Sequence, residues 1–245
     1  MIQVAMIFAA GRGERMRPLT DVKPKPLLEV AGKPLIVWQI EAIAQAGIHD
    51  IVINHAWLGE QIPVALGDGS QFGVRLHYSA EGEALETAGG IAKALPLLKS
   101  CSDSPIFLAV SGDVYTNYNY ARLHAKAAEL ARMEQPHMHL VMVNNPSFHQ
   151  AGDFALDAGK LYSIEADVGQ KLTFGNIGLY DMRLFEPLPV GDKIPMSPYY
   201  RDAVAQGVAS GEYFDGVWEN VGTAVQLEAL NQNLSQNTSN LLVRS

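Results

Sequence analysis

The stretch that decides the fold is VAMIFAAGRGERMRPLT at residues 4–20, followed at once by KPKPL at residues 23–27. The apolar run over residues 4–10 predicts a fully buried strand. The loop after it carries two glycines, three arginines and then two lysines. Glycines let backbone N–H groups approach an anion closely, and basic side chains supply the charge that a polyphosphate requires. We therefore interpret this loop as a phosphate cradle.

Two well-known phosphate motifs do not fit the loop. A Walker A motif needs Lys followed by Ser or Thr five residues after its first glycine, whereas Gly11 is followed there by Met16 and Arg17. A dinucleotide fingerprint needs a third glycine at the position of Met16. An isolated Gly-x-Gly is also compatible with a basic surface turn. The buried strand before the loop and the KPKP sequence after it favour the cradle.

The composition is that of a globular protein. The 245 residues are 48% hydrophobic and 18% charged, which allows one large α/β domain with a sizeable core. The net charge of −8 argues against broad binding of nucleic acid or of an anionic membrane, so the positive loop is a local exception that suits a small anionic partner.

Cysteine usage and targeting signals point to the cytoplasm. The single cysteine, Cys101, excludes an intramolecular disulfide and a cysteine-based zinc site. We find neither a signal peptide nor a run of about eighteen apolar residues, so we expect a cytoplasmic protein without a membrane span. The sequence does not define the oligomeric state, for which a monomer is one possibility.

Apolar runs and helical spacings alternate along the first half of the chain. Strands are expected at residues 4–10, 50–54, 74–78 and 106–110, and helices at residues 35–46, 58–66 and 88–98. Thr87 is a candidate N-cap for the last of these helices. The alternation predicts right-handed β-α-β units and a largely parallel sheet.

The second half of the chain has a different pattern. Short alternating segments with three glycines at residues 153–180 predict an inserted antiparallel ribbon and a second ligand subsite. Around it we expect helices at residues 120–133 and 197–209, strands at 139–143 and 213–218, and a final helix capped by Thr223 and ending at Leu234. One domain over residues 1–234 and a flexible polar tail over residues 235–245 are the resulting expectations.

Polar clusters follow each strand of the expected parallel sheet. They are GRGER at residues 11–15, NH at 54–55, SAEGEALE at 79–86 and SGD at 111–113. Ligands bind at the carboxyl ends of parallel strands, so these clusters should converge on one crevice.

Within that crevice, three positions are candidates for chemistry. Asp113 has the placement of a carboxylate for Mg²⁺, although a turn aspartate is an alternative. The strand-to-helix junction WENVGT at residues 218–223 could bring a polar residue to the same ion, or it could be ordinary capping by Thr223. Lys25, stiffened by two flanking prolines, could place its ammonium on an α-phosphate or could be a solvated surface lysine.

Together these motifs resemble the sugar-1-phosphate nucleotidyltransferase family. The matching stretches, which make the resemblance span about residues 1–234, are AAGRGERMRPLT (9–20), KPKPLL (23–28), GKP (32–34), LETAGG (85–90), SGD (111–113), NIGLY (176–180) and WENVGT (218–223). Further stretches are most similar to the uridylyltransferases of bacterial cell-wall recycling within that family, namely INHAWLG (53–59), YSAEGEALET (78–87), KALPLL (93–98) and GDF (152–154).

The resemblance implies a Rossmann-like, doubly wound α/β fold of the nucleotide-diphospho-sugar transferase type, with a mixed, mainly parallel sheet. It implies Mg²⁺-dependent transfer of a uridylyl group from UTP to a sugar 1-phosphate with release of pyrophosphate. By resemblance the catalytic residues are Arg15, Lys25 and Asp113, and the metal ligands are Asp113 and Asn220. The nucleotide would be bound by Ala10, Gly11, Gly13, Glu14, Arg15, Lys25, Asn54, Glu81 and Thr87, and the sugar phosphate by Asn145, Gly152, Glu165 and Asn176.

Two departures from the family pattern leave alternatives open. Asn220 stands where the family usually has a second metal Asp, so weaker metal binding is expected unless Glu219 substitutes. The sequence EAD at residues 165–167 replaces a Glu-Lys-Pro of many relatives, which leaves the cation for the acceptor phosphate unidentified. The alternatives are an enzyme for glucose or mannose 1-phosphate with UTP, dTTP or GTP, and a weakly active nucleotide-binding sensor.

Overall fold

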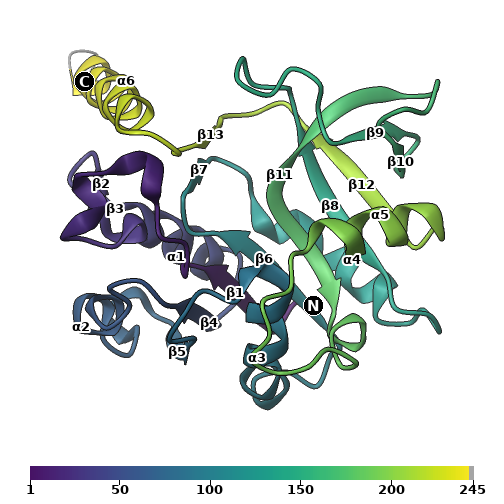
Figure 1. The fold of residues 1–245 in the computed structure, drawn as a ribbon. Coiled ribbons are helices and arrows are strands. Elements are labelled where there is room, and N and C mark those ends of the chain that lie inside the picture. Colours follow the sequence, from purple (N-terminus) through teal and green to yellow (C-terminus); the bar gives the residue numbers. More distant parts are fainter. Residues whose placement is uncertain (243–245) are drawn as a thin grey trace.

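A nine-stranded twisted sheet runs through the protein in the order β5-β4-β1-β6-β11-β8-β12-β10-β9 (Figure 1). The computed structural model describes the backbone of residues 1–242 and the side chains of residues 1–235. One half of the sheet is parallel and consists of β1 (Val4–Phe8), β4 (Asp50–His55), β5 (Arg75–Ala80) and β6 (Ile106–Ser111). The predicted parallel strands and their alternation with helices are confirmed.

Strand β1 lies inside the sheet, and its two faces contact different parts of the core. Ala5 and Ile7 pack with helices α1 (Leu35–Gln45) and α4 (Leu123–Leu130). Val4 and Met6 belong to the core cluster on the other face, which is covered over β1 by helix α3 (Glu86–Ser100) and at the far edge of the sheet by helix α5 (Ser197–Ala205). Because both faces are covered, the strand is apolar at consecutive positions instead of alternating, as the sequence predicted.

The other half of the sheet is mostly antiparallel. Strand β11 (Gln170–Asp181) pairs antiparallel with β6 and with β8 (Met138–Val143), while β12 (Ala209–Phe214) runs parallel to β8. Strands β9 (Phe154–Asp157) and β10 (Lys160–Ser163) complete the edge and pair antiparallel with each other. The mixed α/β sheet is confirmed. Its antiparallel part exceeds the predicted small insertion because β11 continues from the ribbon into the centre of the sheet.

Two short ladders lie outside the main sheet. Strand β7 (Val114–Thr116) pairs antiparallel with β13 (Trp218–Asn220), and β2 (Glu29–Val30) pairs with β3 (Lys33–Pro34). The first ladder matters for function, because the Val221 N–H donates to the Asp113 carbonyl over 3.0 Å. It joins the two strand-to-helix junctions that the sequence singled out.

Several predicted boundaries were wrong. Helix α2 (Gln61–Leu66) begins three residues after the predicted start, and helix α5 ends at Ala205, not at residue 209. The strand predicted at residues 213–218 is β12, which ends at Phe214. Helix α3 begins at Glu86, so Thr87 is inside its first turn and is not its N-cap.

The final helix begins as predicted and ends later. The Thr223 hydroxyl accepts a hydrogen bond from the Gln226 N–H over 3.2 Å, which confirms the cap. Helix α6 (Ala224–Leu242) passes the predicted end at Leu234. Residues 243–245 of the predicted tail are outside the described part of the chain. Within the described residues, no helix combines the length and the hydropathy needed to cross a membrane.

Candidate active site

The loop after β1 folds back on itself around Gly13. Gly13 has φ +68°, and its carbonyl accepts hydrogen bonds from the Thr20 hydroxyl and the Met16 N–H, each over 2.9 Å. A Cβ atom at Gly13 would lie 3.0 Å from Cγ2 of Thr20. Glycine is therefore required there by both the backbone conformation and the close packing. Gly11 differs, because a Cβ there would meet no protein atom within 4 Å. The space beside Gly11 is open to a ligand.

The three arginines of the loop have different surroundings. Arg12 donates to the Thr20 carbonyl over 2.8 Å, forms an ion pair with Asp21 and stacks on the ring of Trp57 at 3.7 Å from its centroid. Arg17 also pairs with Asp21. The hydrogen bonds from these arginines, that of Arg12 foremost, lower the pKa of the Asp21 carboxyl. Both arginines therefore stabilise the loop.

Arg15 is the arginine of the loop that has no ion pair among the described residues. It is exposed, and a Cβ added to Gly222 would meet its guanidinium at 3.0 Å. Arg15 therefore packs against the backbone that follows β13, near Asn220, and leaves its donors available to a polyphosphate. Its predicted neighbour Glu14 is exposed and does not line the cavity described next.

A first cavity of about 410 Å³ opens at the carboxyl ends of β1, β4 and β6. Six predicted site residues line it, namely Ala10, Gly11, Lys25, Asn54, Thr87 and Asp113. Arg12, Glu86 and Ser111 line it too, although the sequence interpretation assigned them no role. Their positions inside the matching motifs GRGER, LETAGG and SGD were the signal that could have identified them. Each of the four strand-end clusters contributes at least one residue to this cavity, so their predicted convergence is confirmed.

Lys25 and Asp113 form an ion pair at this cavity. Asp113 Oδ1 also accepts a hydrogen bond from the Ser111 hydroxyl over 2.6 Å. The prolines on both sides of Lys25 hold it in a short 3₁₀ turn over Lys25–Leu27, and the end of β6 carries Asp113. Two of the three predicted catalytic residues, Lys25 and Asp113, thus lie together at the wall of the cavity.

The surroundings of the Asn220 side chain bear on whether the site can hold a metal ion. Its Oδ1 atom is buried and, among the described residues, has no hydrogen-bond partner. An unpartnered buried carbonyl oxygen is unfavourable unless something else binds it. Amide and carboxylate oxygens are ligands that Mg²⁺ accepts. Asn220 is next to Asp113 through the β7–β13 ladder and the Val221 hydrogen bond, so these two side chains fit the expected metal pair.

The predicted nucleoside residues form a buried network behind the cavity wall. Asn54 Oδ1 accepts from the Ala9 N–H over 3.0 Å, and its amide donates to Glu81 Oε1 over 2.6 Å. Glu81 Oε2 accepts from the Leu85 N–H over 2.8 Å. Burial raises the pKa of the Glu81 carboxyl, and the hydrogen bonds from Leu85 and Asn54 offset only part of that rise.

Glu81 therefore joins β1, β4 and the start of α3, and it does not line the first cavity. The contact of Glu81 with the nucleoside therefore stays a prediction. A Cβ at Gly90 would come within 2.6 Å of Glu81 Oε1 and 2.9 Å of the Asn54 amide. The second glycine of the motif LETAGG thus makes room for this network.

A second cavity of about 710 Å³ lies between the ribbon and helix α5. The predicted sugar residues Gly152, Glu165 and Asn176 line it, together with Asn220. Strand β11 changes register between Phe174 and Gly178, and Asn176 has φ +54°. Such a bulge turns a side chain out of the regular alternation, and here it directs Asn176 into the cavity. A second cavity is thus present where the pattern change predicted a second ligand subsite.

Asn145 was predicted to bind the sugar, but it does not line the second cavity. Its amide donates to the carbonyls of Gln150 and Lys171, and its Oδ1 accepts from the Thr173 hydroxyl over 2.9 Å. A Cβ at Gly152 would lie 2.9 Å from the same Oδ1. Asn145 therefore fixes the loop that carries Gly152 to β11, and its contact with the sugar stays a prediction.

A narrow space of about 210 Å³ connects the two cavities. It shares Phe8, Glu86, Thr87 and Ser111 with the first cavity, and Phe174, Asn176, Ser197 and Tyr200 with the second. One ligand in each cavity could therefore meet at this connection, with Asp113 on one side and Asn220 on the other. Helix α5 contributes Ser197, Tyr200 and Arg201 to the second cavity. The helix was predicted but its place at the cavity was not, because the predicted sugar ligands are confined to residues 145–176.

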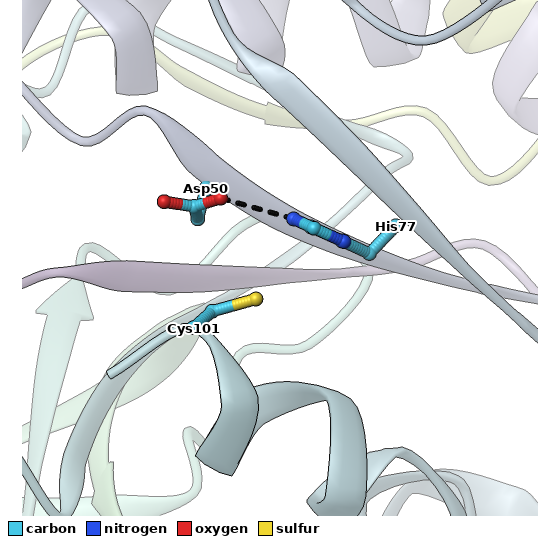
Figure 2. Close-up of side chains that lie close together, drawn as sticks. All are labelled: Asp50, His77 and Cys101. Carbon is cyan, nitrogen blue, oxygen red and sulfur yellow. Dashed lines mark hydrogen bonds and ion pairs between the residues drawn. The ribbon is translucent and has the colours of Figure 1, made fainter. Parts of the chain in front are cut away.

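A separate cluster lies at the opposite end of β4 and β5, where Asp50, His77 and Cys101 place their polar atoms within 4.8 Å of one another (Figure 2). Arg75 donates from Nε to Asp50 Oδ1 over 2.8 Å and pairs with Oδ2, while His77 contacts Oδ1 over 3.0 Å. Burial opposes ionisation of Asp50, but the hydrogen bonds from Arg75 and His77 outweigh it and lower the pKa.. A guanidinium that occupies both oxygens disfavours a cation there, so this cluster is a surface ion-pair network.

Comparison with known proteins defines the class. Residues 4–148 match the model of the nucleotidyl transferase family. A relative from Neisseria meningitidis serogroup B, named N-acetylmuramate alpha-1-phosphate uridylyltransferase, is 48% identical over 91% of this chain and 95% of its own length. The chain belongs to the nucleotidyl transferase family.

Other similar proteins agree with this class. A protein of the same name from Caulobacter vibrioides is 32% identical over 90% of this chain and 92% of its own length. The solved structure of a putative glucose-1-phosphate thymidylyltransferase from Bacillus anthracis superposes with a TM-score of 0.77, at 19% identity, over 95% of this chain and 94% of that chain. This likeness shows the fold. The predicted family and the predicted similarity to its uridylyltransferases are confirmed.

Proposed function

We propose that the protein transfers the uridylyl group of UTP to N-acetylmuramate α-1-phosphate, giving UDP-N-acetylmuramate and pyrophosphate. The observation that carries the proposal is the 48% identity to a protein of that name over nearly the whole of both chains. The two connected cavities support it, since they suit a nucleotide in one and a sugar phosphate in the other. The product would return a recovered cell-wall sugar to nucleotide-activated form.

In the proposed reaction, a phosphate oxygen of the acceptor attacks the α-phosphorus of UTP in line with the leaving pyrophosphate. A new P–O bond forms while the bond between the α- and β-phosphates breaks, and pyrophosphate leaves with the bonding electrons. The nucleophile is already anionic, so no general base is required. Catalysis then depends on positioning and on compensation of negative charge around the phosphorus.

Residues in and beside the first cavity have matching roles in this proposal. Lys25 places its ammonium beside the α-phosphate, and the open space at Gly11 lets the triphosphate approach the backbone N–H groups. Arg15 binds the outer phosphates from beside Gly222. Asp113 and Asn220 would hold Mg²⁺, which when bound supplies further positive charge to the phosphates.

Pyrophosphate release tests the proposal with N-acetylmuramate 1-phosphate, N-acetylglucosamine 1-phosphate and glucose 1-phosphate as acceptors, each with UTP and Mg²⁺. We expect the largest kcat/KM for the muramate acceptor. A larger value for glucose 1-phosphate would replace the proposed acceptor. Binding of UTP without turnover of any acceptor would favour a nucleotide sensor, in which case Asn220→Asp should restore activity.

A further inference from the structure

Helix α5 presents one face to the second cavity. Ser197, Tyr200 and Arg201 line that cavity, and their spacing of three and four residues places them on the same side of the helix. Tyr200 anchors this face, because its hydroxyl shares a 2.8 Å hydrogen bond with that of Tyr180 and its ring contacts Phe174 at 5.2 Å between centroids. The backbone that carries Arg201 is therefore held in place by its neighbour.

Arg201 is the only lysine or arginine lining the second cavity in the part of the chain whose side chains are described. In that part its guanidinium has no hydrogen bond or ion pair. The two carboxylates of the cavity have other donors. Asp153 accepts from the Phe174 N–H over 2.8 Å and from His149 over 3.0 Å, and Glu165 accepts from the Ser163 hydroxyl over 2.7 Å. The five donors of Arg201 are thus left for a ligand.

The position of Arg201 indicates which part of the acceptor it meets. The acceptor phosphate must reach the connecting space, because there it would meet a nucleotide bound in the first cavity. Asn176, Ser197 and Tyr200 line both this connection and the second cavity, whereas Arg201 lines the second cavity and an outer groove with Val204. Arg201 is therefore at the end of the sugar site farther from the reacting phosphates.

The proposed acceptor carries its second negative charge at some distance from its phosphate. N-acetylmuramate differs from N-acetylglucosamine by a lactyl ether that ends in a carboxylate. A guanidinium matches a carboxylate with two parallel N–H···O hydrogen bonds. We infer that Arg201 binds the lactyl carboxylate and so makes the site selective for an acidic N-acetyl sugar. This inference rests on the proposed function and assigns the specificity of the same site.

The test compares wild-type protein with Arg201→Ala and Arg201→Lys, using N-acetylmuramate 1-phosphate, its lactyl methyl ester and N-acetylglucosamine 1-phosphate. We expect Arg201→Ala to lower kcat/KM for the acidic acceptor about 10- to 100-fold, mainly through KM. The ester and the glucosamine acceptor lack the charge, so their values should change less than about twofold. Arg201→Lys should recover part of the loss. Asp202→Ala is the control, because Asp202 is exposed on the same helix and lines neither cavity.

Two results would overturn the inference while leaving the proposed function intact. One is an Arg201→Ala variant that keeps the wild-type preference for the acid over its ester. The other is an equal loss with all three acceptors, which would place Arg201 at the phosphate or in the fold. The comparison of the acid with its ester on wild-type protein needs no variant. It therefore tests the inference even if a substitution prevents folding. Equal kcat/KM for the two acceptors would contradict the inference. A wild-type protein that turns over none of the three acceptors contradicts both the inference and the proposed function.

Discussion

Lys25 and Asp113 form an ion pair across 88 positions of sequence, one from the loop after β1 and the other from the end of β6. Their side chains are only 12% and 23% exposed. Each group therefore compensates the charge of its partner at the wall of the first cavity. In the proposed function, Lys25 would also face the phosphates of the nucleotide, and Asp113 would bind the cation.

Replacement of Lys25 tests its role directly. We expect Lys25→Ala to lower kcat by more than about tenfold, because the positive charge beside the α-phosphorus is lost while the substrates still fit. Lys23→Ala is the matched control, since Lys23 pairs with Glu29 at 2.9 Å and does not line the cavity. Steady-state pyrophosphate release measures both variants. Full activity of Lys25→Ala would remove this lysine from the catalytic role.

The amide at Asn220 should weaken metal binding relative to a carboxylate. We expect Asn220→Asp to reduce the Mg²⁺ concentration for half-maximal activity by roughly tenfold, and Asn220→Ala to increase it. Binding of Mn²⁺, followed by electron paramagnetic resonance in the presence of UTP, gives a readout that does not depend on turnover. Identical metal affinities in all three proteins would show that residue 220 is not a ligand.

Substitution of Gly11 should affect ligand binding, whereas substitution of Gly90 should affect stability. A Cβ at Gly11 meets no protein atom, so Gly11→Ala should keep the free energy of unfolding within about 0.5 kcal/mol but reduce UTP affinity. A Cβ at Gly90 meets Glu81 and Asn54, so Gly90→Ala should destabilise the fold by about 1–3 kcal/mol. Urea unfolding and calorimetric UTP titration measure the two effects. Loss of stability in Gly11→Ala, or none in Gly90→Ala, would contradict the geometry.

The raised pKa of the Glu81 carboxyl predicts that the free energy of unfolding depends on pH. Burial raises the pKa of its carboxyl in the folded state above the ordinary value of 4.5. Between the unfolded and folded values the native state binds more protons, so the contribution of Glu81 to the free energy of unfolding falls as pH rises through that window. Glu81→Gln cannot titrate. The stability of wild type relative to this variant should therefore decrease upward from about pH 4.5, as measured by urea unfolding. A constant or increasing difference would show that the folded pKa is not raised.

The sequence was sufficient to predict the parallel half of the sheet and the cavity at its edge. Strand β1 is apolar throughout because it is covered on both faces, and its loop, Lys25 and Asp113 belong to contiguous motifs at strand ends. The topology of parallel strands brings such ends together, so the first cavity could be predicted without coordinates. The hydrogen-bond network of Glu81 was not predicted, because it depends on the space at Gly90, a contact between residues of different elements.

The acceptor half was less predictable for physical reasons. The pairing partners of β11 are distant in sequence, and the bulge that directs Asn176 depends on the register with β8. Arg201 belongs to a helix that joins the ribbon only in the folded state, so a search around Glu165 could not identify it. Patterns along the chain report burial and local conformation, whereas these contacts depend on tertiary structure.

The central claim is that a sugar phosphate attacks the α-phosphorus of UTP. Phosphorus NMR of a mixture of protein, UTP, Mg²⁺ and N-acetylmuramate 1-phosphate follows every phosphate of that reaction at once. We predict that the signals of both substrates disappear together and are replaced by those of pyrophosphate and of a sugar nucleotide diphosphate. Persistence of the sugar phosphate signal, whether UTP remains intact or is hydrolysed, would contradict the account.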